Sequence, residues 1–236
     1  MRSAISDPFE SVSLHVDALY RRDAVGRLLE SNEASPTPAP RVFIARTTAG
    51  ACCYFHADVP KALAYEIRNL VVALPSYPVR RGEIAAYAAV EEAIAAAGPI
   101  RSRWHGLAYE FGEPVAPRSS EIAQITDDRS ALQGQFADFR IKLDKMGPFF
   151  AIIRDGAVVS ACYSARTTAD AAEAGVDTDP AHRGRGFAAT VVNAWRAAIE
   201  DSGRTALYST SYDNLSSQAV ARRLGMRQYA ETYSLT

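Results

Sequence analysis

The chain has 236 residues, of which 48% are hydrophobic and 22% charged, and its formal net charge is −1. This composition is typical of a globular protein with a sizeable core, arranged as one large domain or two small ones. It argues against a nucleic-acid binder, because the arginine pairs are scattered and form no basic stripe. No apolar run reaches the ~20 residues of a membrane helix, and the N-terminus lacks the apolar core of a signal peptide. We therefore expect a cytoplasmic protein with no membrane partner.

The first half of the chain predicts a small α/β unit and carries no motif that we can tie to chemistry. Apolar residues from about Ser11 to Glu30 follow a helical stripe, and a loop with three prolines comes after it. Asp58 is a candidate cap for a helix that contains Leu63 to Leu74. The other predicted elements are strands at 41–46, 51–56 and 103–111 and an alanine-rich helix at 83–97.

A stretch rich in proline, glycine and serine, residues 112–120, is the best candidate for a linker. We expect it to separate an N-terminal domain, residues 1–117, from a second domain, residues 118–236. In the second domain we expect a strand at 121–125 and a helix from Asp127 or Asp128 to about Lys145. Strands at 149–153 and 158–163 follow, and Asp155-Gly156 between them is a strong hairpin signal.

A glycine-rich turn, residues 182–188, lies between a predicted strand at 174–178 and a helix that ends at Gly203. The first N–H groups of a helix have no internal partner, and the helix dipole adds positive potential there. Gly184 and Gly186 allow a ligand to approach the backbone, and Arg183 and Arg185 carry charge suited to phosphate oxygens. The turn is therefore either a phosphate site or an ordinary structural turn.

The remainder of the chain repeats the strand-then-helix order. A strand at 205–210 precedes Asn214, which is placed to cap a helix that ends at Gly225, and residues 227–235 form a last strand. With Arg183, Gly186 and Ala188 in the pattern Arg-x-x-Gly-x-Ala, and with Asn214 and Leu224-Gly225 at the two ends of this helix, the chain resembles the GNAT acetyltransferase superfamily. The resemblance covers about 151–235, and its outer limit lies at residue 121.

The resemblance implies an α/β (α+β) fold with a mostly antiparallel mixed sheet that is splayed between the family's fourth and fifth strands, flanked by helices and preceded by a smaller α/β domain. That added domain could itself be a degenerate copy of the same fold. The pantetheine arm of acetyl-CoA would lie in the splay and its pyrophosphate on the glycine-rich turn. The cofactor-binding residues implied are Val176, Asp177, Thr178, Arg183, Gly184, Arg185, Gly186, Phe187, Ala188, Asn214 and Ser217.

Catalytic groups are less well marked. Glu173 precedes the ligand-facing end of the fourth strand, where some family members have a general base; the alternative is an exposed strand carboxylate. Family members often use a tyrosine seven residues after the Asn214 position as the acid, but this chain has Ala221 there. Tyr212 and Ser217 are the candidate substitutes, with Tyr208 a further option. The alternative is that no acid is required, because the thiolate of CoA is a tolerable leaving group by itself.

The resulting hypothesis is an N-acetyltransferase that moves an acetyl group from acetyl-CoA directly to a primary amine of a small molecule or peptide. The alternatives are a CoA-binding regulatory protein without turnover and an interaction protein whose glycine turn is only a turn. The four histidines show no metal-ligand spacing, so we expect no metal. We expect a monomer or a homodimer. The three cysteines, in apolar runs, are expected to be buried free thiols.

Overall fold

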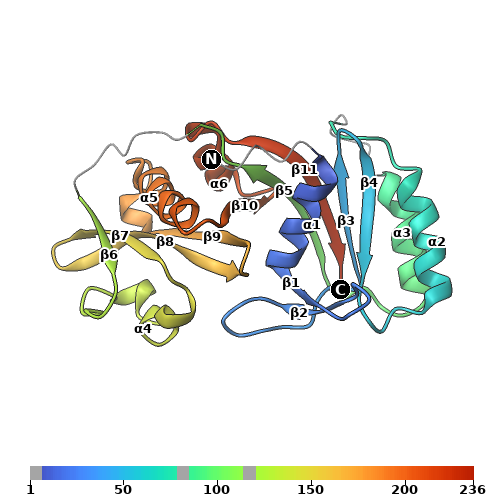
Figure 1. The fold of residues 1–236 in the computed structure, drawn as a ribbon, viewed down its shortest axis with the longest axis horizontal. Helices are drawn as coiled ribbons and strands as arrows, with labels where there is room; N and C mark the ends of the chain where they lie inside the picture. The colour runs from blue at the N-terminus through green and yellow to red at the C-terminus, as the bar shows by residue number, and fades with distance from the viewer. Residues whose placement is uncertain (1–6, 79–84, 114–120) are drawn as a thin grey trace.

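The computed structural model describes residues 7–78, 85–113 and 121–236 (Figure 1). Its main feature is a nine-stranded sheet in the order β4-β3-β11-β5-β10-β9-β8-β7-β6, with helices packed on both faces. Of the strand pairs that the described residues form in this sheet, β9 with β10 is parallel and the rest are antiparallel. The predicted α/β class with a mostly antiparallel mixed sheet is therefore confirmed. In the described part of the chain, no helix has the length and apolar character needed to cross a membrane.

The N-terminal segment differs from the single helix predicted over about 11–30. Helix α1 (Pro8–Leu19) ends at Leu19, and a two-stranded hairpin follows, formed by β1 (Tyr20–Arg22) and β2 (Leu28–Ser31). The physical cause is the turn between the strands. There Asp23 accepts hydrogen bonds from two backbone N–H groups and Gly26 adopts a φ of 84°, which breaks the helical path.

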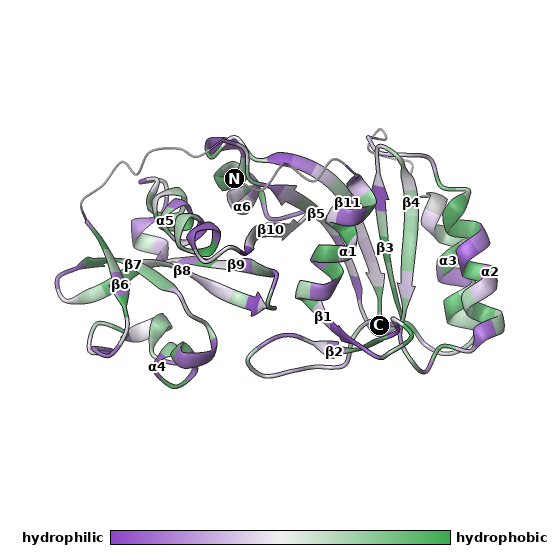
Figure 2. Ribbon diagram, in the orientation of Figure 1, coloured by the Kyte–Doolittle hydropathy of each residue, from purple (hydrophilic) through white to green (hydrophobic). Residues whose placement is uncertain are grey.

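Two helices pack beside each other on one face of the sheet at its β4 edge. They are α2 (Lys61–Val72) and α3 (Ala85–Ala96), and they cover β3 (Val42–Thr47) and β4 (Gly50–Phe55). In Figure 2 both helices carry hydrophobic and hydrophilic residues, as expected for helices that bury one side. The predicted cap at Asp58 is wrong, because Pro60 occupies the N-cap position of α2.

Helix α1 packs on the opposite face of the sheet. Along β3, Val42 and Ile44 belong to the core beneath α2 and α3, whereas Phe43 belongs to the core that α1 forms. Because side chains alternate between the two faces of a strand, this pattern places α1 and the α2–α3 pair on opposite faces.

The second half contains the predicted hairpin, β7 (Phe149–Arg154) and β8 (Ala157–Thr167), with positive φ at Asp155 and Gly156. β6 (Ile122–Ile125) pairs with β7 at the sheet edge. The helix predicted from 127 or 128 to 145 is wrong. That stretch forms only short pieces, η1 (Gly134–Phe136), α4 (Phe139–Lys142) and η2 (Leu143–Lys145), and Gly134 has a φ of 55° that interrupts any continuous helix.

The remaining elements follow β8 in chain order, and the glycine-rich turn lies among them. They are β9 (Ala171–Thr178), η3 (Pro180–His182), α5 (Phe187–Asp201), β10 (Thr205–Ser211), α6 (Leu215–Arg223) and β11 (Arg227–Leu235). Helix α5 buries Val191, Val192 and Trp195 against the sheet. The Trp195 indole donates a hydrogen bond of 3.1 Å to Ser164 Oγ, which satisfies its one polar atom.

Strand β5 (Arg103–Glu110) comes from the first half of the chain but lies between β10 and β11 of the second half. It pairs with β11 along its whole length and with β10 over residues 106–110. The two halves thus share one sheet. The boundary predicted between residues 117 and 118 lies outside the described residues, and the division into two domains stays a prediction.

Candidate active site

The parallel strands β9 and β10 form a fork. Their pairing begins at Ala171 and Thr205 and ends at Glu173 and Leu207, although β9 continues to Thr178 and β10 to Ser211. Beyond that point the two strands do not pair with each other, so backbone polar groups along the inner edges of the fork need other partners. A ligand with amide groups could supply them.

The glycine-rich turn joins the end of β9 to α5. Asp179 caps the short helix η3 by accepting a hydrogen bond of 2.8 Å from Ala181 N–H. Gly184 and Gly186 both have positive φ, 76° and 84°, and Gly186 is the N-cap of α5 without a side-chain cap. The first N–H groups of α5 therefore have no capping oxygen and present a site for an anion.

A cavity of about 500 Å³ lies beside the end of β9, between the first turn of α5 and one face of α6. Ten of the eleven residues predicted to bind cofactor are among those lining it: Val176, Asp177, Thr178, Arg183, Gly184, Gly186, Phe187, Ala188, Asn214 and Ser217. The exception is Arg185, which is exposed and whose Nη2 lies 3.4 Å from Ala181 O. The structure thus brings the predicted group together, while each residue's contact with a cofactor stays a prediction.

Asn214 occupies the cap position proposed for it. Its side-chain oxygen accepts a hydrogen bond of 3.0 Å from Ser217 N–H, so the N-cap interpretation is confirmed. Because Asn214 also lines the cavity, the cap fixes one wall of it.

Arg223 also lines the cavity, although it was not among the residues predicted to bind cofactor. A Cβ atom placed on Gly186 would lie 2.8 Å from both Cζ and Nη1 of Arg223, so the guanidinium lies directly against this glycine. Ser216, Ala219, Val220 and Arg223 all line the cavity. Their spacing of three, one and three residues is that of a single helix face, and this is the signal that could have revealed Arg223.

Ser217 forms a hydrogen-bonded pair with Tyr208. The Tyr208 phenol, which reaches across from β10 and is 1% exposed, contacts Ser217 Oγ and lies 3.2 Å from Ser217 O. Burial raises the pKa of Tyr208 to about 12, against a smaller lowering by the bond to Ser217, so the phenol keeps its proton at neutral pH. Ala221, at the position of the family's usual tyrosine, is fully buried in the core.

Tyr212, another predicted catalytic residue, is not among the residues that line the cavity. Its ring stacks on His105, with centroids 4.5 Å apart, and its backbone N–H donates to His105 O at 2.9 Å. The structure therefore does not bring Tyr212 to the cavity wall where Ser217 lies.

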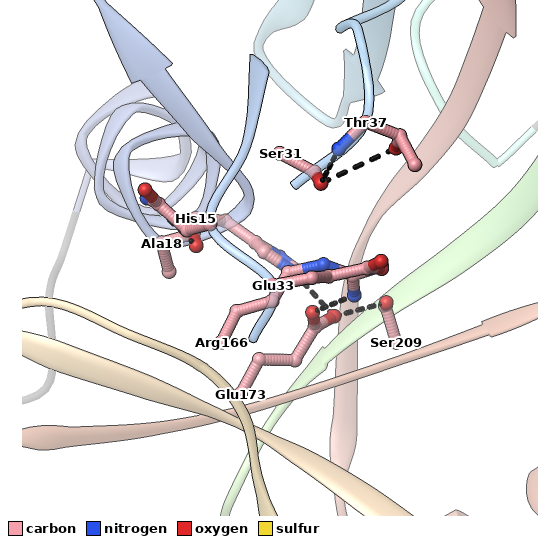
Figure 3. Close-up of polar contacts among 9 residues, drawn as sticks. His15, Ala18, Ser31, Glu33, Thr37, Arg166, Glu173 and Ser209 are labelled. Atoms are coloured by element: carbon pink, nitrogen blue, oxygen red, sulfur yellow. Dashed lines mark hydrogen bonds and ion pairs between the residues drawn. The ribbon is translucent and has the colours of Figure 1, made fainter. Parts of the chain in front are cut away.

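Glu173 is neither exposed nor at the cavity wall. It is 2% exposed, and its carboxylate accepts from Arg166 Nη1 at 2.5 Å, from His15 Nε2 at 3.1 Å and from the Ser209 hydroxyl (Figure 3). Burial acts to raise the pKa of Glu173, but the Arg166 charge and the bonds from His15 and Ser209 outweigh it and hold the pKa far below its usual range. The exposed-carboxylate interpretation is thus wrong, and this environment argues against a general base at Glu173.

Within the described residues, no group of three or more histidine, cysteine, aspartate or glutamate side chains could hold a metal ion. All three cysteines are free, as expected. The expected burial is correct for Cys162 but wrong for Cys52 and Cys53, which are partly exposed.

Comparison with solved structures finds several chains of similar fold at low sequence identity. Similar structures include a GNAT-family protein from Novosphingobium aromaticivorans (19% identity, 58% of this chain, 66% of that one, TM-score 0.46). A second is a GCN5-related N-acetyltransferase-like protein from Streptococcus suis (20% identity, 57% of this chain, 62% of that one, TM-score 0.44). A third is a GCN5-related N-acetyltransferase from Kribbella flavida (16% identity, 98% of this chain, 96% of that one, TM-score 0.47). The chain spans less than two thirds of the first two proteins.

No protein with a curated description matches the sequence. The family model for GNAT acetyltransferase matches residues 116–235, which is just over half of the chain and contains the fork, the glycine-rich turn and the cavity. The chain therefore belongs to the GNAT acetyltransferase family.

Proposed function

We propose that this protein is an N-acetyltransferase that uses acetyl-CoA and acts on a primary amine of a small molecule or peptide. The observation that carries the proposal is the cavity, which extends from the end of β9 to the uncapped N-terminus of α5 and is lined on its other side by α6. Membership of an acetyltransferase family supports it. The predicted cytoplasmic location and the oligomeric state, monomer or homodimer, stay predictions.

The residues present suit a pyrophosphate-bearing ligand. Arg183 and Arg223 both line the cavity, on the glycine-rich turn and on α6, and would balance phosphate charge. The first N–H groups of α5 would donate hydrogen bonds to phosphate oxygens, and Gly186 leaves room for the Arg223 guanidinium against the turn. When bound, acetyl-CoA would supply an acetyl group activated as a thioester.

The chain's own polar groups would then serve the leaving sulfur. Ser217 Oγ stands at the cavity wall, and the Tyr208 phenol behind it holds a proton at neutral pH. We assign this pair the role of the missing family tyrosine. Ser217 is the hydroxyl nearest the sulfur and would donate a proton to it, and Tyr208 would then donate its own proton to Ser217.

Binding and turnover can be measured separately. Acetyl-CoA at about a hundred times its dissociation constant should raise the unfolding free energy by about 2.7 kcal/mol, seen as a thermal shift that ATP does not reproduce. Thiol release over a library of amines and short peptides should then identify the acceptor. Absence of any shift with millimolar acetyl-CoA would refute the proposal.

The second candidate is a CoA-binding regulatory protein without turnover. Two observations favour it: Glu173 is sealed in an ion-pair network, and Ala221 replaces the usual acid. A clear thermal shift with no thiol release from any amine tested would select this candidate.

A further inference from the structure

If the proposed function holds, the acceptor amine needs a polar partner near the fork. In acetyl transfer a C–N bond forms, a C–S bond breaks, the nitrogen gives up one proton and the sulfur gains one. Glu173 is poorly placed to take that proton, because Arg166, His15 and Ser209 already occupy its carboxylate oxygens. The residue that meets the amine must therefore be sought beside Glu173 rather than at it.

We propose that Ser209 contacts the acceptor amine and that Glu173 acts as a positioning residue for Ser209. Ser209 lies on β10 two residues beyond Leu207, the last residue of β10 that pairs with β9, so it stands where the fork opens. It is partly exposed, whereas its partner Glu173 is 2% exposed. Of the two residues, Ser209 is therefore the more exposed.

Tyr208 and Ser209, the β10 residues assigned to the sulfur and to the amine, lie on opposite faces of the strand. Tyr208 belongs to the core beneath α5 and contacts Ser217, while Leu207 packs with Ala18 of α1 on the other face. Ser209 shares the face of Leu207, because side chains alternate along a strand. The hydroxyl pair assigned to the sulfur and the hydroxyl assigned to the amine thus lie on opposite faces, with the open fork between them.

The hydrogen bond fixes how Ser209 can act. Its hydroxyl hydrogen is donated to Glu173, so the oxygen lone pairs are left to accept an N–H of the amine (Figure 3). The carboxylate behind the hydroxyl also favours the positive charge that develops on the nitrogen as the C–N bond forms. Glu173 remains ionised, and the proton passes from the nitrogen to water.

The network holds this arrangement from several parts of the chain. Arg166 on β8 joins Glu173 to Glu33, which follows β2, and His15 on α1 joins Glu173 to the Tyr229 hydroxyl on β11. The position of the Ser209 hydroxyl therefore depends on elements of both halves of the chain, which gives it a fixed direction before any ligand binds.

A labelling experiment tests the location of Ser209 without relying on activity. In the S209C variant we expect iodoacetamide to modify residue 209, and saturating desulfo-CoA, which lacks the thiol that would consume the reagent, to slow that modification at least tenfold. Cys52 and Cys53, partly exposed on β4, serve as internal controls whose labelling desulfo-CoA leaves unchanged. An unreactive Cys at 209, or one that desulfo-CoA does not protect, overturns the inference. Failure of the wild type to bind CoA overturns instead the proposed function.

Kinetics test the role. S209A should lower kcat/KM for the amine roughly 10- to 100-fold, the loss of one hydrogen bond assisted by charge, while the Kd of CoA from calorimetry stays unchanged. S209T should restore most of the rate. Ser211→Ala, on the same strand and face, is the matched control and should behave as wild type. Equal rates for S209A and S211A would refute the role.

The pH profile distinguishes positioning from proton acceptance. If Glu173 positions Ser209, E173Q lowers kcat/KM at every pH but keeps the acidic limb of the profile. This limb is the fall of kcat/KM at low pH that comes from protonation of the amine itself. Loss of that limb in E173Q would show that Glu173 is the base and would overturn the inference. If E173Q does not fold, the S209A and S209T measurements decide the question.

Discussion

Arg223 and its neighbour Arg222 end α6, yet only Arg223 lines the cavity and lies against Gly186. We expect R223Q to weaken CoA binding about fivefold, equivalent to about 1 kcal/mol for a partly solvated charge contact. R222Q, one residue away and exposed, should bind as wild type. Calorimetry at low and high salt checks both, since screening should shrink the difference. Equal affinities for the two variants would remove Arg223 from the site.

Tyr208 acts through Ser217 in our account. Y208F should lower kcat about tenfold without changing the Kd of CoA, because the phenol lies behind the cavity wall. Y109F is the matched control: Tyr109 faces Tyr208 across the β5–β10 pair and shares its core cluster. Since burial raises the pKa of Tyr208 to about 12, this group should cause no loss of rate at pH values well below 12. A Y208F enzyme with wild-type kcat would contradict the assignment.

At the residue scale, backbone-driven features were predictable and side-chain partners were not. The glycine turn and the Asn214 cap follow from local chemistry, namely positive φ and a free N–H group. The surroundings of Glu173 could not be foreseen, because His15, Arg166 and Ser209 come from three distant segments. Long-range partners of this kind leave no spacing in the sequence.

The glycine-rich turn is the element on which cofactor binding depends. G186A places a side chain at a φ of 84° and against the Arg223 guanidinium, whereas G203A meets similar strain, with φ 81°, and open space. Each should lose about 1 kcal/mol of stability from the left-handed backbone. Only G186A should also weaken CoA binding, by fivefold or more. Urea denaturation and calorimetry on both variants measure the two effects, and unaltered binding by G186A would exclude the turn.

The Glu173 network ties α1 to β8 and β9. E173Q should cost about 3 kcal/mol at pH 7, the lower end for breaking a buried pair, because the Arg166 side chain is 26% exposed. The surface-pair variant E30Q should cost under about 1 kcal/mol. Urea denaturation of both variants checks these values.

The same network predicts a pH dependence of stability. The folded-state pKa of Glu173 lies below its unfolded value, so its contribution is complete above about pH 5 and is lost as the pH falls further. Wild-type stability should therefore drop more steeply than that of E173Q on acidification. Parallel curves for the two proteins would show that Glu173 is not held as described.

Element prediction succeeded where one local signal dominated. The Asp155-Gly156 hairpin, helix α5 after the glycine-rich turn and the Asn214-capped helix α6 were correct for that reason. It failed at 20–31 and 127–145, where apolar residues suggested helix but Gly26 and Gly134 take positive φ and break it. Single glycines inside a helical pattern were given too little weight.

On the scale of the whole molecule, the sheet is built from both halves of the chain. Residues 118–236 expressed alone would lack β5, leaving the facing edges of β10 and β11 without a partner. We expect that fragment to aggregate or stay unfolded by circular dichroism, and to fold when co-expressed with residues 1–117. A fragment of 118–236 that unfolds cooperatively and binds CoA would show that β5 is dispensable. The insertion of β5 could not be predicted, because strand order depends on non-local pairing.

The central claim is that the cavity between α5 and α6 holds acetyl-CoA, and a crystal structure with saturating acetyl-CoA tests it most directly. We predict the pyrophosphate on the N-terminus of α5 beside Arg223, and the thioester within the β9–β10 fork near Ser217. Acetyl-CoA bound elsewhere, or no density in the cavity at saturation, would contradict the account.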